Sequence, residues 1–109
     1  VADISAEGGE RTVSDINHIH ADRSAFVMTD VTNEDSINAC MDFAVSKFGS
    51  LDILVNNAVW FCFGHLRGAG NGSGTGTDRD ITDADWSRIF NTNVLGYAKC
   101  IKAAAAHMR

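Results

Sequence analysis

The chain has 109 residues, with 14 Asp and Glu against 9 Lys and Arg, so its formal net charge is −5 and a generally basic nucleic-acid-binding protein is excluded. Hydrophobic residues make up 45% and charged residues 21%, a balance typical of a folded soluble domain and not of a disordered or fibrous chain. No apolar run approaches the ~20 residues of a membrane span, and no secretory signal pattern opens the chain, so we expect a cytoplasmic protein without nucleic-acid or membrane partners.

The chain opens on a strand end followed by a helix. Residues 1–4 are mostly apolar and read as the last residues of a strand. Ser5 is a suitable N-cap for the polar segment that follows. The pattern predicts a helix that runs to about His20, although Gly8 and Gly9 weaken its first turn.

A second strand and a second helix come next. Residues 25–28 are a short apolar run closed by the polar pair 29–30, which is the signature of a buried strand. Thr32 and Asp35 stand in capping-box spacing, with Asp in the place of Glu, and apolar residues recur at helical spacing after them. The pattern predicts an amphipathic helix that ends at Gly49.

A third apolar run covers residues 51–55, interrupted only by Asp52, and ends at Asn56 and Asn57. It predicts another buried strand. Strands that are continuously apolar and alternate with helices indicate a parallel α/β fold. Ligands bind such sheets beyond the carboxyl ends of the strands, and the polar residues of this chain gather at those ends.

A long loop and a long helix complete the chain. Glycines alternate with small or polar residues over 64–80, as in a flexible loop. Gly68, Gly72 and Gly74 match a phosphate-loop spacing, but they lie far from their strand and lack a directly following helix, so we reject that interpretation. Beyond the loop, a capping box opens one helix over 82–108, with its apolar residues on one face.

Two carboxylates at strand ends suit a nucleotide. Asp3 can accept hydrogen bonds from the two hydroxyls of an adenosine ribose and would repel a 2′-phosphate, which favours NAD over NADP. The alternative is an ordinary Asp near a helix start. Asp30 can accept a hydrogen bond from the adenine amine while Val31 packs on the adenine ring. The alternative is that Asp30 only stabilises its own loop, as Asp residues commonly do.

The pair Asn56-Asn57 can bridge its loop to neighbouring elements and still offer backbone groups to a ligand, while the small Ala58 lets a ribose approach. A turn formed by the two Asn residues is the alternative. Asn93 lies in the apolar stripe of the last helix, where an unpaired buried amide would cost about 1–3 kcal/mol. It therefore either ties a neighbouring backbone or holds a water for proton transfer.

The aromatic residues Trp60 and Phe61 follow the Asn pair and suit either the wall of a pocket for an apolar substrate or core packing. The three cysteines are widely spaced and indicate reduced thiols. Cys62 has no evident activating base. His18 and His20 lack a third ligand nearby, so we assign no metal.

Together these features resemble the short-chain dehydrogenase/reductase family, in its common alcohol dehydrogenase and ketoreductase type. The resemblance is carried by Asp3, Asp30-Val31, the run LDILVNNA over 51–58, and the spacing from Trp86 to Asn93-Val94-Leu95-Gly96. It covers nearly all of this chain but only the central part of a family member. Residues 1–109 therefore look like an internal part of one NAD(P)-binding domain. Val59 replaces the Gly of the family's Asn-Asn-Ala-Gly signature.

The resemblance implies a Rossmann-type doubly wound parallel sheet whose first strand and C-terminal part are missing here. It implies hydride transfer between nicotinamide and a secondary alcohol or ketone, with NAD preferred over NADP. Asn93 matches the catalytic Asn that kinks the long helix and holds a relay water, whereas the family's Ser and Tyr-x-x-x-Lys are absent. The implied cofactor-binding residues are Asp3, Ile4, Asp30, Val31, Asn56, Asn57 and Ala58.

The helix over 82–108 resembles the one through which family members dimerise, so we expect a homodimer or homotetramer. In the order of a doubly wound sheet, the missing strand would lie between the first and third strands of this chain. Their exposed edges predict that the 109 residues alone form no stable, active enzyme. The alternatives are a non-catalytic NAD-binding relative, an inactive truncated product and an unrelated α/β interaction module.

Overall fold

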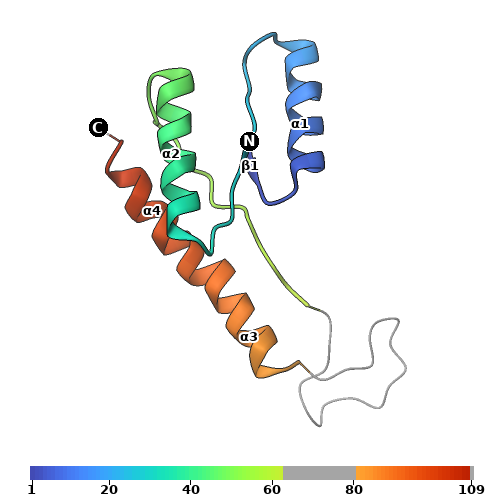
Figure 1. Ribbon diagram of the computed structural model, residues 1–109, viewed down its shortest axis with the longest axis vertical. Coiled ribbons are helices and arrows are strands. Elements are labelled where there is room, and N and C mark those ends of the chain that lie inside the picture. The colour runs from blue at the N-terminus through green and yellow to red at the C-terminus, as the bar shows by residue number, and fades with distance from the viewer. Residues whose placement is uncertain (63–80, 109) are drawn as a thin grey trace.

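A computed structural model describes residues 1–62 and 81–108, and in Figure 1 the long C-terminal helix runs along one side of the other described elements. The predicted loop over 64–80 lies outside the described residues. The elements are β1 (Ala2–Asp3), α1 (Ala6–Ile19), β2 (Val27–Met28), α2 (Glu34–Phe48), α3 (Asp83–Phe90), the π-helical segment η1 (Asn91–Leu95) and α4 (Gly96–Ala105). Strands β1 and β2 pair in parallel, with Ala2 opposite Val27 and Asp3 opposite Met28, which confirms the predicted parallel α/β class.

Helix α1 begins as predicted, because the Ser5 hydroxyl accepts a hydrogen bond from the Gly8 N–H at 3.3 Å. Gly9 is buried against the ring of Phe26. A Cβ on Gly9 would lie 2.1 Å from the nearest ring carbon of Phe26. The close approach of helix and strand segment therefore requires glycine at a position where helix propensity alone disfavours it.

Helix α2 ends as predicted at Gly49, whose φ of +89° is the left-handed conformation that glycine adopts most easily. The predicted start is wrong by one residue. Asn33 is the N-cap and accepts from the Ser36 N–H at 2.9 Å. Thr32 instead donates its hydroxyl to Asp30 Oδ1 at 2.7 Å, so the preceding turn uses the side chain that the capping-box spacing assigned to the helix.

The third predicted strand is not formed within the described residues. Residues 51–60 hold no regular secondary structure, and over the whole range their side chains do not alternate between buried and exposed as they would in a strand. Leu51 and Leu54 pack against the core, whereas Ile53 and Val55 are 78% and 77% exposed. A strand needs a neighbour for its backbone hydrogen bonds, and the described sheet contains only β1 and β2.

The long C-terminal helix is continuous through α3, η1 and α4 (Figure 1). Its start is the predicted capping box, in which the Asp85 N–H donates to Thr82 Oγ1 at 3.2 Å and the Thr82 N–H donates to Asp85 Oδ2 at 2.9 Å. The prediction of one uniform apolar face is wrong. Phe90, before the π-helical turn, is 56% exposed, whereas Cys100 beyond it is buried. A π-turn holds one more residue than an α-turn. The side chains after the turn are therefore rotated about the helix axis relative to those before it.

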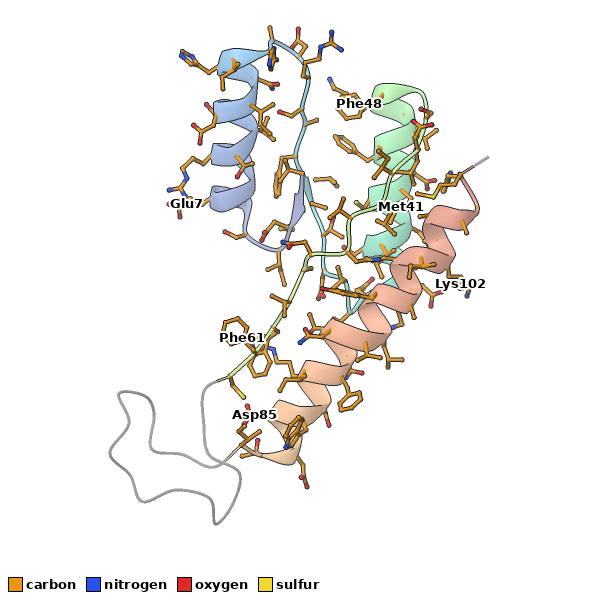
Figure 2. The ribbon with its side chains drawn as sticks, turned by 180° about the vertical axis from the view of Figure 1, so that it is seen from behind. Glu7, Met41, Phe48, Phe61, Asp85 and Lys102 are labelled. Atoms are coloured by element: carbon orange, nitrogen blue, oxygen red, sulfur yellow. The ribbon has the colours of Figure 1, made fainter. Side chains whose placement is uncertain are left out.

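The core lies between α2 and α4. It consists of Ile37 and Met41 from α2 and Cys100 and Ala104 from α4, and Figure 2 shows Met41 at this helix pair. Polar contacts reinforce the same seam at its surface, since Lys102 Nζ lies 3.4 Å from a carboxylate oxygen of Glu34. No helix in the described ranges has the length and apolar character needed to cross a membrane.

Candidate cofactor site

One hollow brings most of the predicted site residues together. It has a volume of about 830 Å³ and lies where the loops after β1 and β2 approach residues 54–60 and one side of the long helix. The predicted site residues that line it are Asp3, Ile4, Asp30, Val31, Asn56, Asn57, Ala58 and Trp60. Phe61 and Asn93 do not line the hollow, and Phe61 lies 59% exposed on the segment beside α3 (Figure 2).

Asp3 follows the predicted geometry for a strand-end carboxylate. It is the last residue of β1 and is exposed. Its Oδ1 accepts a hydrogen bond from the Ser5 N–H at 2.8 Å, which fixes the carboxylate at the start of α1. A carboxylate accepts several hydrogen bonds through its two oxygens, so this contact leaves capacity for hydroxyl donors.

Asp30 forms a turn at the end of the second strand segment. Its Oδ1 accepts from the Thr32 N–H at 2.8 Å and from the Thr32 hydroxyl, and its own N–H donates to Ser36 Oγ at 2.9 Å. The hydrogen bonds from Thr32 lower the pKa of Asp30, and the positive charge of Arg88 acts in the same direction. Asp30 is therefore an anion held in a fixed orientation at the hollow.

Val31 and the Asn pair provide an uncharged part of the wall. Val31 packs against the core, and a Cβ on Gly96 of α4 would lie 3.1 Å from Val31 Cγ2. Asn56 is half-buried and Asn57 is exposed, and neither side chain makes a hydrogen bond within the described residues. The predicted bridging by these amides is therefore not seen there, and the wall retains polar groups that can meet a ligand.

Asn93 ties two segments together through both ends of its amide. Its Oδ1 accepts from the Trp60 N–H at 2.9 Å, and its Nδ2 donates to the Trp60 carbonyl at 2.8 Å. The sequence left two roles for Asn93: a tie to a neighbouring backbone, or a hold on a water for proton transfer. The structure shows the tie to the backbone of Trp60. The residue lies in η1, and π-turns inside α-helices are frequent at functional sites.

Arg88 is a site residue that the sequence analysis missed. Its Cζ lies 4.5 Å from the centre of the Trp60 ring, within the ~6 Å range of a cation–π contact. It also lines the hollow with Trp60. A signal was available, because an Arg stands near Asn93 in the helix and an aromatic patch follows the Asn pair, but only the folded chain brings the two together.

The three cysteines form no disulfide, and one of them is buried. Cys40, Cys62 and Cys100 are all free. Burial raises the pKa of the Cys100 thiol, and the neighbouring Cys40 adds to the effect, so Cys100 is held in its unreactive protonated form. In the parts of the chain that the structure describes, no group of His, Cys, Asp and Glu residues is arranged to hold a metal ion.

Comparisons with known proteins agree with this arrangement. The family model described as short chain dehydrogenase matches residues 1–109. The cis-4-hydroxycyclohexanecarboxylate dehydrogenase of Sinomonas cyclohexanicum is 37% identical over 106 residues, which are 94% of this chain and 36% of that protein. The 7alpha-hydroxysteroid dehydrogenase of Escherichia coli K12 is 32% identical over 108 residues, which are 99% of this chain and 37% of that protein.

Solved structures give the same result. A short chain dehydrogenase/reductase from Burkholderia phymatum, in complex with NAD, is similar with a TM-score of 0.80 and 29% identity. The match covers 98% of this chain and 34% of that one. This likeness confirms the expected Rossmann-type fold, and this chain spans little more than a third of the length of the proteins it matches.

Proposed function

The chain belongs to the short-chain dehydrogenase family, and from this premise we propose that the intact protein is an NAD-dependent oxidoreductase acting on a secondary alcohol or ketone. The observation that carries the proposal is the gathering of Asp3, Asp30 and residues 56–58 around one hollow. Asp3 and Asp30 stand at the carboxyl-end edge of the parallel two-stranded sheet, and residues 56–58, which lie outside the sheet, line the same hollow. Dinucleotides bind at this edge in doubly wound folds.

The residues around the hollow fit the adenosine half of NAD. Asp3 offers carboxylate oxygens for the ribose hydroxyls, and its negative charge opposes a 2′-phosphate. Ile4, beside it, and Val31 offer apolar contacts for the adenine, while Asp30 offers an acceptor for its amine. Ala58 leaves room for a ribose. When bound, NAD supplies the nicotinamide carbon that accepts or donates the hydride.

The similar structure from Burkholderia phymatum contains NAD, which supports NAD as the proposed cofactor of this protein. The carboxylate of Asp3 supports it independently, because a site built for NADP generally places a positive charge near the 2′-phosphate. Asp3 and Asp30 are the two acids that line the hollow among the described residues, and both favour a ribose without an additional phosphate.

Asn93 is proposed as a catalytic residue that holds a water of the proton relay. The tie to Trp60 uses one lone pair of Oδ1 and one hydrogen of Nδ2. An amide has two donor hydrogens and two acceptor lone pairs, so half of the side chain's hydrogen-bonding capacity remains for a water. The tie fixes the orientation in which that water would be held.

The substrate is proposed to be an apolar secondary alcohol or the corresponding ketone. Trp60 and Phe61 offer aromatic surface next to the cofactor segment, and Phe61 is 59% exposed. The names of the two relatives describe hydroxyl groups on a cyclohexane ring and on a steroid, which supports an alicyclic alcohol.

We also propose that the intact protein is a cytoplasmic homodimer or homotetramer that associates through the long helix. Large apolar side chains on this helix are exposed in the single chain, which is the usual state of a surface that a partner covers. They are Trp86 (41% exposed), Phe90 (56%), Val94 (51%) and Ile101 (57%).

The proposed function is tested by titrating the full-length protein with NADH and NADPH and following the fluorescence. A screen of alicyclic alcohols and ketones as substrates follows. Tight NADH binding, weak NADPH binding and turnover are the expected results. Tight binding without turnover would indicate a non-catalytic relative. Binding of neither dinucleotide would contradict the proposal and favour an unrelated α/β interaction module.

A further inference from the structure

We propose that Arg88 is a positioning residue, which holds the ring of Trp60 and thereby sets where residues 56–58 meet the cofactor. The inference rests on the proposed NAD-binding function and extends it to a residue of the long helix that lines the same hollow. It follows from three observations: the double attachment of Trp60, the lack of regular structure around it, and the charges of the hollow.

The long helix attaches to Trp60 at two points. Arg88, in α3, lies with its Cζ 4.5 Å from the centre of the indole ring. Asn93, in η1, pairs with the N–H and the carbonyl of the Trp60 backbone. The ring and the backbone of one residue are therefore fixed by the same helix, which leaves Trp60 little freedom to rotate.

The segment before Trp60 depends on such attachments. Residues 51–60 form no strand and have no ladder of backbone hydrogen bonds in the described structure. Leu51 and Leu54 anchor the beginning of the segment in the core, and Trp60 anchors its end. The cofactor-binding residues 56–58 lie between the two anchors, so their position follows that of Trp60.

The charges of the hollow favour a positioning role over direct binding of an anionic substrate. Of the described residues that line it, Arg88 is the only base, and Asp3 and Asp30 are the only acids. The charge of Arg88 acts on Asp30, whose pKa it helps to lower. The guanidinium already lies on the indole face of Trp60, which is the contact that the described residues show for it.

The test is a double-mutant cycle in the full-length protein, with the Kd for NADH as the readout. Arg88→Met and Trp60→Leu are each expected to weaken NADH binding about twofold to fivefold, the range that corresponds to an exposed cation–π contact. The double variant is expected to bind no more weakly than Trp60→Leu alone, because the second change removes a contact already lost. Arg88→Lys keeps the charge but not the planar stacking, so an intermediate affinity is expected.

Steady-state kinetics separates positioning from catalysis. In Arg88→Met the KM for NADH is expected to rise while kcat at saturating cofactor stays within twofold of the parent value. Lys102→Met is the matched control, since Lys102 is an exposed cation on α4, away from the segment that bears Phe61 (Figure 2). Its Kd for NADH is expected to equal that of the parent.

Three outcomes would overturn the inference while leaving NAD binding intact: an unchanged Kd in Arg88→Met, additive losses in the double variant, or a rise in KM confined to anionic substrates. A parent protein that binds neither dinucleotide would overturn this inference together with the proposed function. Because Arg88 is exposed, the Arg88 variants are expected to fold, and thermal unfolding checks this for them and for the variants at the half-buried Trp60.

Discussion

At the scale of single residues, the proposed preference for NAD over NADP depends on Asp3. We expect Asp3→Ala in the full-length protein to weaken NADH binding about 10-fold to 100-fold, because hydrogen bonds to a charged group contribute about 1.5–3 kcal/mol. The same change is expected to improve NADPH binding by removing the repulsion of the 2′-phosphate. Fluorescence titration measures both. Asp15→Ala, which removes an exposed carboxylate from α1, is the control, and an unchanged NADH affinity in Asp3→Ala would contradict the assignment.

Asp30 predicts a pH dependence of stability. The hydrogen bonds from Thr32 lower its pKa in the folded state, so the ionised carboxylate stabilises the fold at pH values above the ordinary carboxyl pKa. This contribution is lost as the pH falls through the lowered value. Asp30→Asn, which lacks the charge, is therefore expected to be less stable than the parent at neutral pH, with the difference shrinking in acid. Urea unfolding between neutral and acidic pH measures the difference, and a constant gap would contradict the argument.

At the scale of elements, two adjacent glycines of α1 give opposite predictions. Gly9→Ala places a methyl group 2.1 Å from a ring carbon of Phe26, and such overpacking typically costs about 1–3 kcal/mol. Gly8→Ala meets only the Ser5 side chain, with Oγ at 3.4 Å, and gains up to about 1 kcal/mol of helix propensity. Urea unfolding of the two full-length variants is expected to show a loss for the first and a small gain for the second. Equal effects would show that packing on Phe26 is unimportant.

Element boundaries also show what can be predicted from a sequence. The caps at Ser5, Gly49 and Thr82 depend on nearby residues, and all three predictions are confirmed. The start of α2 was predicted one residue early, since Thr32 and Asn33 are both suitable caps and only the turn around Asp30 decides between them. The π-turn and the state of residues 51–55 depend on contacts between distant segments, which local patterns do not contain.

The site follows the same rule. Residues whose role depends on their place at a strand end, such as Asp3 and Asp30, were predicted and do line the hollow. Arg88 was missed because its contact with Trp60 exists only after the long helix has folded back on an earlier segment. Asn93 was identified by its position in an apolar stripe, and its partner could be named only from the structure.

At the scale of the whole molecule, the described part of the chain has few of the interactions that stabilise a fold: its sheet is small and many of its apolar side chains are exposed. Its sheet has two strands of two residues each, and two-stranded sheets are marginal in water. Large apolar side chains such as Ile53 and Met28 are 78% and 65% exposed. We therefore expect the isolated 109-residue chain to unfold without a cooperative transition and to bind no NADH. A sharp calorimetric transition together with NADH binding would contradict this prediction.

The π-turn at Asn91–Leu95 constrains how many residues this part of the long helix can contain. Each α-helical residue turns the helix by about 100°, so the one extra residue gives the helix two different phases. The phase of α4 is set by the burial of Cys100 and Ala104, and that of α3 by the contact of Arg88 with Trp60. Deleting a single residue from the turn would align the two phases and leave one of these contacts unmade. At this point of the helix the number of residues is therefore as constrained as their identity.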